Sequence, residues 1–216
     1  MTNQPKAFGQ SLIGMIQKLK MINIIAENIA NAKSIGYQRQ IPESANFESV
    51  LSDLGDKKSF RDDTPGALQK TGHMFDLAIE GNAYFLVEGK NGVEPTKNGS
   101  FRLNEKGNLC NSDGQEVVVI EKTDKPLSLA KDYDITIRQN GEILIGTERY
   151  GRLAMRIMDN KPVKVHQGYL EGSNVNLMNE MVTLAMTYRA FESSEKMLSM
   201  ELSADKELIE KYGKNV

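Results

Sequence analysis

The strongest constraint on this chain is an apolar seam of helical spacing at each of its two ends. Near the amino terminus, apolar residues recur at alternating intervals of three and four: Leu12, Met15, Leu19, Ile22, Ala26 and Ile29. The same spacing recurs near the carboxyl terminus: Leu177, Met181, Leu184, Tyr188, Phe191, Leu198 and Leu202. This spacing lets helices wrap around one another. Because an isolated helix is marginal in water, each seam needs cover from the other or from further subunits.

The ends of both expected helices carry local signals. Polar and glycine stop signals accompany the end of the first seam at Asn28, Asn31 and Gly36. We expect the second helix to begin at an N-cap, either Ser173 or Asn174, and to run to about Tyr212. Thr187 falls outside the second seam, so we expect it to be exposed.

The middle of the chain has a different apolar period, close to two, which is typical of strands. The segments that fit are residues 76–80, 84–88, 116–120, 134–138, 142–146 and 152–158. Gly-containing pairs such as Asn140-Gly141 separate them and predict turns. The best hairpin surrounds this pair, and its register is open. A two-residue loop sets Ile137 opposite Leu144, whereas a longer turn sets it opposite Ile143.

These patterns predict an α+β fold, in which helices from the two termini form a coiled-coil-like inner domain and a β-rich middle domain is inserted between them. The expected domains are an N-terminal axial helix (1–36), an extended connector (37–64), the β-rich domain (65–164) and a C-terminal axial helix (165–216). The connector shows no clear period, and we expect it to order only in contact with neighbours. A closed helical hairpin within one monomer is an equally open reading of the seams.

Composition excludes several classes of function. The formal net charge of -2 and a pI of about 5.8 imply no basic face, so nucleic acid is not an expected partner. The single cysteine, Cys110, excludes an internal disulfide framework. No apolar run approaches the ~18 residues of a membrane span, and the first 20 residues lack the layout of a cleaved signal peptide. We therefore expect a cytoplasmic protein, or one exported without a cleaved signal.

No catalytic, cofactor or metal site is expected. The chain lacks the glycine-rich nucleotide-binding fingerprints, the Gly-x-Ser-x-Gly elbow and the His-Glu-x-x-His motif. His73 and His166 lack ligand spacing and are read as loop residues, and Cys110 as a small buried apolar residue. An enzyme with an unrecognised site would need a deep pocket with convergent polar groups.

Several segments together resemble a known family, in its order along the chain. Residues 28–39 read NIANAKSIGYQR, which resembles the N-terminal signature of flagellar axial proteins. Further matches are QKTGHMFDLAIEGNAYFLV at 69–87, TKNGSFRLNEKGNL at 96–109, HQGYLEGSNVNLMNEMV at 166–182 and YRAFE at 188–192. Ala83, Pro95 and Lys97 depart from the residues usual in these motifs. The phrase TPGALQKTG at 64–72 is most similar to the proximal rod type.

The resemblance implies a structural subunit of the flagellar basal-body rod and no enzymatic activity. It implies as partners copies of this chain, other rod subunits and the flagellar type III export apparatus, with no membrane insertion and a location in the periplasmic rod. It also implies a head-to-tail interface that does not close into a ring. The implied interface comprises both seams and the residues that flank them: Asn28, Asn31, Gly36, Tyr37, Ser173, Asn174, Val175 and Asn176. Alternatives are a distal rod or hook-type subunit, and a free-standing β-domain binding module.

Overall fold

The computed structural model describes residues 4–42, 59–123, 127 and 135–212. It is a mixed helix and strand fold with a long helix at each end and a β-rich middle, which confirms the expected α+β class. The middle of the expected connector, residues 43–58, lies outside the described residues. Two compact units form. The helical unit draws on Met1–Ala30, Gln40–Arg61 and Asn176–Val216, and the strand unit on Asn31–Arg39 and Asp62–Val175.

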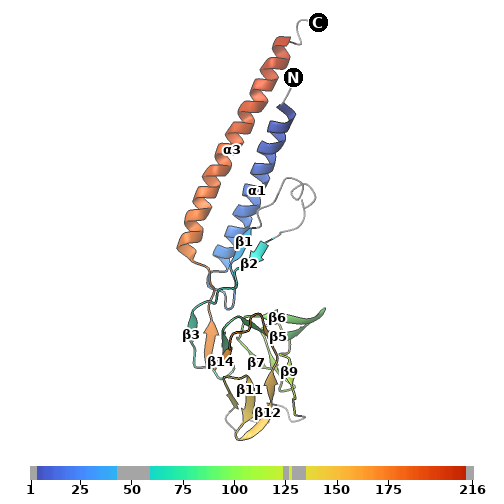
Figure 1. The fold of residues 1–216 in the computed structure, drawn as a ribbon, viewed down its shortest axis with the longest axis vertical. Coiled ribbons are helices and arrows are strands. Elements are labelled where there is room, and N and C mark those ends of the chain that lie inside the picture. Colours follow the sequence, from blue (N-terminus) through green and yellow to red (C-terminus); the bar gives the residue numbers. More distant parts are fainter. Residues whose placement is uncertain (1–3, 43–58, 124–126, 128–134, 213–216) are drawn as a thin grey trace. The chain divides into compact units, whose positions relative to one another are not determined.

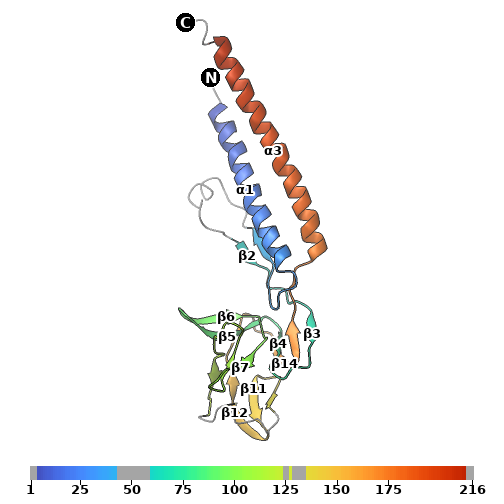
Figure 2. The same ribbon diagram turned by 180° about the vertical axis from the view of Figure 1, so that it is seen from behind.

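The helical unit is built on an antiparallel pair of helices, α1 (Gln4–Ala30) and α3 (Leu177–Tyr212), which lie side by side (Figures 1 and 2). Polar contacts join them at two levels. Lys18 Nζ donates to Ser194 Oγ at 2.7 Å, and Asn28 Nδ2 donates to Glu180 Oε2 at 3.3 Å. Two short strands, β1 (Gln40–Pro42) and β2 (Ser59–Arg61), pair antiparallel in the same unit.

The start of α3 differs from the expectation. Asn176 is the N-cap, because its Oδ1 accepts a hydrogen bond from the Asn179 amide at 3.0 Å. Ser173 and Asn174 were wrong as N-caps, since their side chains are used elsewhere. Ser173 Oγ accepts from the Val175 amide in a local turn, and Asn174 binds backbone groups distant in sequence.

The strand unit consists of short antiparallel strands that form several small sheets. Their bounds are β3 (Leu68–Lys70), β4 (Leu77–Glu80), β5 (Ala83–Gly89), β6 (Gly92–Thr96), β7 (Arg102–Leu103), β8 (Leu109–Cys110), β9 (Val119–Ile120), β10 (Ile135–Ile137), β11 (Glu142–Ile145), β12 (Glu148–Leu153), β13 (Met155–Ile157), β14 (Lys164–Gln167) and β15 (Tyr169–Glu171). The largest sheet has the order β10-β11-β12-β9, and β5 lies between β13 and β6. The pairs β14-β4, β15-β3 and β7-β8 complete the unit.

The Asn140-Gly141 hairpin forms with the longer of the two turns considered. Ile137 pairs with Ile143, and Thr136 pairs with Leu144. The Arg138 amide donates to the Glu142 carbonyl at 2.8 Å, which leaves a three-residue loop. Gly141 has a φ of 83°, the left-handed conformation that such a loop requires at its last position.

Two of the expected strands are divided in the structure. The segment 152–158 is interrupted at Ala154, where the chain passes from β12 in one sheet to β13 in another. The Ala154 amide donates to the Val118 carbonyl, and its carbonyl accepts from the Leu86 amide, so this residue bridges two neighbours. In the segment 116–120, Glu116 and Val117 each form an isolated β-bridge, with Cys110 and Val87 respectively, and β9 begins only at Val119.

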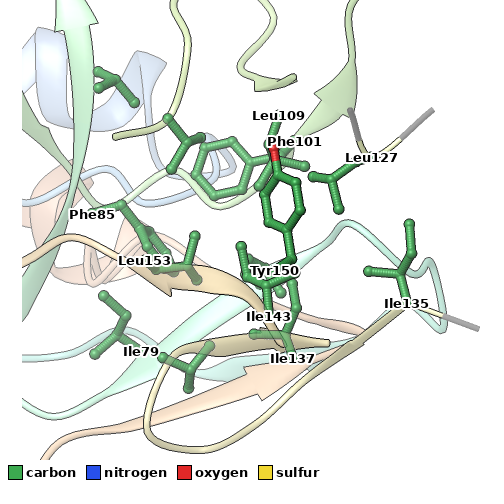
Figure 3. Packing of buried hydrophobic residues seen from close by; sticks show 14 of the residues in the cluster. Ile79, Phe85, Phe101, Leu109, Leu127, Ile135, Ile137, Ile143, Tyr150 and Leu153 are labelled. Atoms are coloured by element: carbon green, nitrogen blue, oxygen red, sulfur yellow. The ribbon is translucent and has the colours of Figure 1, made fainter. Parts of the chain in front are cut away.

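The hydrophobic core lies within the strand unit and collects side chains from most of its strands (Figure 3). Phe85 is fully buried and meets Phe101 edge to face, with ring centroids 5.2 Å apart. Tyr150, Leu153 and Ile143 come from β11 and β12 and contribute fully buried side chains to the same cluster. The core therefore ties β5 to the sheet that holds β11 and β12.

We predict that Phe85→Ala will destabilise the strand unit by about 3–5 kcal/mol, because it removes a buried aromatic ring and leaves a cavity. The chain has no tryptophan, so urea unfolding followed by near-ultraviolet circular dichroism of tyrosine is the suitable measurement. The control is Val93→Ala on β6, where the side chain is 57% exposed. This control should change stability by less than about 0.5 kcal/mol. Equal losses in the two variants would contradict the core described here.

Candidate functional site: a buried carboxylate cluster and the exposed face of α3

A buried carboxylate, Glu171 in β15, holds together segments that are distant in sequence. Its Oε2 accepts from Lys97 Nζ at 3.2 Å, and its Oε1 accepts from the Gly66 amide at 3.0 Å. Its backbone carbonyl accepts from the Gly36 amide at 2.8 Å. The side chains of Lys97 and Glu171 are only 2% and 4% exposed. We call these residues, with Tyr84 and Asn174, the Glu171 cluster.

Lys97 has further partners that compensate for its burial. Its Nζ also donates to the Gly81 carbonyl at 3.2 Å and lies 5.4 Å from the centroid of the Tyr84 ring. A buried ion pair stabilises a fold only when its remaining hydrogen-bonding groups are satisfied. Here the ammonium and the carboxylate both have additional partners, so the pair meets that condition.

The Tyr84 hydroxyl links the segment before β1 to the segment after β2. It lies 3.0 Å from Gln38 Oε1 and 2.9 Å from Asp63 Oδ1. A phenol has one proton and can donate to only one of these two oxygens. With the Gln38 amide turned by 180°, its Nε2 donates to Tyr84 and Tyr84 donates to Asp63.

The Asn174 side chain joins the chain on either side of the β1-β2 pair. Its Oδ1 accepts from the Arg39 amide at 2.6 Å, and its Nδ2 donates to the carbonyls of Asp62 and Thr64 at 2.9 and 2.8 Å. The Thr64 hydroxyl and amide donate to the Asp62 carboxylate and lower the pKa of Asp62 below its ordinary value. Asn174 therefore acts as a connector between backbones and not as a helix cap.

Two glycines in this region leave no space for a side chain. Gly36 has a φ of 65°, and a Cβ there would lie 2.5 Å from the Asn98 amide nitrogen. A Cβ on Gly66 would lie 2.0 Å from the Gly172 carbonyl oxygen. Each glycine therefore permits a close approach between backbones on which the Glu171 cluster depends.

Asn28 has a corresponding role inside the helical unit, where it is 1% exposed. Its Oδ1 accepts from the Gln40 amide at 2.8 Å, and its Nδ2 donates to the Gln40 carbonyl at 2.9 Å. The same Nδ2 reaches Glu180 on α3. One side-chain amide thus fixes the last turn of α1 to both β1 and α3.

The buried positions of the helix pair coincide only in part with the two predicted seams. On α1 the buried residues are Ile13, Ile24, Ile25 and Asn28. On α3 Glu180 and Thr187 are buried, so the expectation that Thr187 is exposed was wrong. Thr187 faces α1 because it shares a helical face with Glu180, Leu184 and Phe191, at intervals of three and four.

The predicted seam and flanking residues are therefore divided by exposure. The half-buried ones are Met15, Ile22, Ile29, Asn31, Gly36, Tyr37, Ser173, Asn174, Val175, Leu184, Phe191 and Leu198. The exposed ones are Leu12, Leu19, Ala26, Asn176, Leu177, Met181, Tyr188 and Leu202.

Exposed methionines lie along the sides of α3 that do not face α1, together with charged residues such as Arg189 and Lys196. Five of the eleven methionines of the chain are exposed there: Met178, Met181, Met186, Met197 and Met200. At about 100° per residue, Met178 projects roughly 200° away from Glu180 on the buried face. We call this surface the methionine face. Its exposure distinguishes α3 from a helix whose apolar side is fully used within the monomer.

The described residues include both histidines and the cysteine of the chain. Within them, no group of three or more His, Cys, Asp or Glu side chains is arranged to hold a metal ion. His166 Nε2 lies 2.7 Å from Glu80 Oε2, and this hydrogen bond lowers the pKa of Glu80. Cys110 is buried. Neither described helix has an apolar stretch of the length that a membrane span requires.

Comparison with known proteins assigns the family. Residues 166–209 match the model of the flagellar basal body rod FlgEFG protein C-terminal region, and residues 78–145 match that of the flagellar hook protein FlgE/F/G D1 domain. The flagellar basal-body rod protein FlgF of Mesorhizobium japonicum is 30% identical over 90% of this chain and 92% of its own length. The chain belongs to the flagellar basal-body rod protein family.

Other rod proteins are similar over comparable lengths. FlgF of Rhizobium meliloti is 31% identical, over 87% of this chain and 90% of its own length. The rod protein FlgG of Buchnera aphidicola (strain Bp) is 27% identical, over 85% of this chain and 90% of its own length. The resemblance to the rod protein family seen in the sequence is thereby confirmed.

The segments that carried this resemblance meet in the Glu171 cluster. Gly36, Tyr84, Lys97 and Glu171 each come from a different one of the family-like segments. Sequence reasoning did not single out Lys97 or Glu171 as a pair, because 74 positions separate them. The sequence did contain one signal for this pair. Glu171 is an acidic residue that follows Tyr169 and Leu170, and a charge in such an apolar setting needs a partner.

We predict that Glu171→Gln will destabilise the strand unit by about 3–5 kcal/mol, because it leaves the Lys97 ammonium buried without a counter-charge. Adding Lys97→Met should recover part of this loss, so the two effects should differ from additivity by about 0.5–3 kcal/mol. Urea unfolding of the two single variants and the double variant measures this coupling. Strict additivity would contradict it. Glu142→Gln, which removes an exposed pair with Arg138, is the control and should cost less than about 1 kcal/mol.

Proposed function

We propose that this chain is a structural subunit of the flagellar basal-body rod, where it stacks helically to build the shaft that transmits torque to the hook and filament. The observation that carries the proposal is the division of α3 into two faces. One side contacts α1 within the monomer, and the remaining sides present the methionine face to solvent. Membership of the rod protein family supports the same role.

The methionine face has the properties of an assembly surface. Burying a large apolar side chain contributes roughly 1.5–3 kcal/mol, so several together can hold subunits in contact. Methionine adapts to irregular neighbours, which suits a surface that meets more than one kind of partner. The methionine face is proposed to meet a different surface of the next subunit, so that the contact is heterologous and can propagate along a helix without closing. Leu12 and Leu19 on α1 are exposed and extend the proposed interface.

The partners of this subunit are copies of itself and other rod subunits, whose terminal helices pack in a coiled-coil-like way. The proposed domains keep the boundaries expected from the sequence: axial segments at 1–36 and 165–216, which contain α1 and α3, a connector at 37–64 and the β-rich domain at 65–164. The subunit acts in the periplasmic part of the basal body, as the proximal type of rod protein. It reaches that place through the flagellar type III apparatus, without a cleaved signal.

We predict that Met186→Glu will abolish incorporation into the rod and leave the monomer intact. Met186 is 65% exposed, and glutamate is a good helix former, so the monomer should keep its stability within about 0.5 kcal/mol. A charge in the assembled interface would instead be desolvated without a partner. The amount of the variant in purified basal bodies is the measurement. Normal incorporation would refute the role of the methionine face.

Two variants serve as controls for this experiment. Met186→Leu keeps an apolar side chain and should be incorporated normally. Thr187→Glu places a charge at a position that is 8% exposed and faces α1. It should therefore weaken the helix pair in the monomer, which circular dichroism at rising temperature detects. The contrast between neighbouring positions 186 and 187 separates assembly from folding.

Deletion of the gene tests the function as a whole. Cells that lack this chain should be non-motile and should lack the structures beyond the rod, because the shaft is interrupted. Motility plates and electron microscopy of basal bodies give the two readouts, and a plasmid copy of the gene should restore both. A deletion strain that swims normally would refute the proposed function.

A further inference from the structure

The side chain of Gln167, at the end of β14, occupies the outer edge of another strand, β10. Its Oε1 accepts from the Ile137 amide at 3.0 Å, and its Nε2 donates to the Ile135 carbonyl at 2.9 Å. The second N–H of Nε2 donates a hydrogen bond to the Met74 carbonyl at 3.0 Å. Both protons of the amide nitrogen are thus used, and the amide oxygen has a partner.

This pattern reproduces that of a neighbouring strand. A residue that pairs in parallel with Thr136 would donate to the carbonyl of residue 135 and accept from the amide of residue 137. The Gln167 amide makes the same two bonds, so it substitutes for one peptide group. Backbone pairing continues beside it, because the Val165 amide donates to the Gln139 carbonyl at 2.9 Å.

Among the described residues, no strand of the same sheet pairs with the part of this edge that Gln167 covers. In the sheet order of the part of the chain that the structure describes, β10 is a terminal strand and pairs with β11. Arg138 faces β11, since its amide donates to Glu142, and the alternate groups of Ile135 and Ile137 therefore face outward. A shallow hollow of about 370 Å³, lined by Met74, Thr136 and Gln167 among others, runs beside this edge. Thr136 is exposed.

An open strand edge of this kind can pair with the same edge of a second copy, because each edge presents both amide donors and carbonyl acceptors. In an antiparallel pair of two copies, Ile135 of one strand would exchange hydrogen bonds with residue 137 of the other, and the reverse. Such a contact has two-fold symmetry and closes into a dimer. Unpaired edge strands are the usual sites of unwanted pairing between chains, and proteins block them by several devices.

We propose that Gln167 is a built-in substitute for a strand, which keeps the outer edge of β10 from pairing with the same edge of a second copy of this chain. The device acts within the strand unit and does not rest on the helix faces. A subunit that presents a methionine face to its partners thereby avoids a competing contact through its sheet.

A thiol at the centre of the expected contact tests the proposal. In the antiparallel dimer, the two copies of Thr136 form a pair without hydrogen bonds, about 4.5 Å apart at Cα, which a disulfide can span. Thr136→Cys combined with Gln167→Met should form a disulfide-linked dimer under mild oxidation. Thr136→Cys with Gln167 intact should form about tenfold less, because its edge hydrogen bonds are already made.

Matched variants make the result decisive. Thr136→Cys with Gln139→Ala replaces an exposed neighbouring glutamine and should behave like Thr136→Cys alone. Gln167→Asn, one methylene shorter, replaces Gln167→Met if the latter fails to fold, and should also give the dimer. Equal dimer in the presence and absence of Gln167 would overturn the proposal. So would absence of dimer in a folded Gln167 variant, which would assign the side chain a purely stabilising role.

Discussion

The strand unit depends on the hydrogen bonds and the ion pair made by the buried carboxylate of Glu171. A charge with so little exposure needs a full set of partners, and the fold provides them from segments far apart in the sequence. The need for those partners explains the glycines at 36 and 66, whose missing side chains let backbones approach. It also brings the segment 31–39 beside 171–175, where the Asn174 amide donates to the Tyr37 carbonyl.

The sequence predicted the type of each long element but not the choice of face. The seams predicted both helices correctly, yet polar residues such as Thr187 and Glu180 occupy the contact between them. Apolar residues lie on more than one side of each helix, so spacing alone could not select the face. Strands with apolar alternation, such as 135–137, were predictable. The short strand KVHQ (β14) was not, because its pairing with β4 and not its composition defines it.

The two faces of α3 have different properties: one fixes the register of the helix pair, and the other can fit neighbours of different shapes. Hydrogen bonds such as Lys18 to Ser194 and Asn28 to Glu180 can be satisfied in one register of the helix pair only. Polar contacts of this kind fix alignment even where they add little to stability. The methionine face carries no such restriction, and its flexible side chains can fit differently shaped neighbours. One helix can therefore have a single arrangement within the monomer and several arrangements outside it.

The exposure of the five methionines also has a chemical consequence. A thioether on the surface is open to oxidants, and conversion to the sulfoxide turns a flexible apolar side chain into a polar one. Oxidation would change the methionine face without touching the buried core or the Glu171 cluster, so an oxidised subunit would remain folded. Damage would become apparent only when the subunit met its neighbours, and enzymatic reduction of the sulfoxides would reverse it. Oxidation of a subunit would thus alter the surface that we propose for its assembly and leave its fold unchanged.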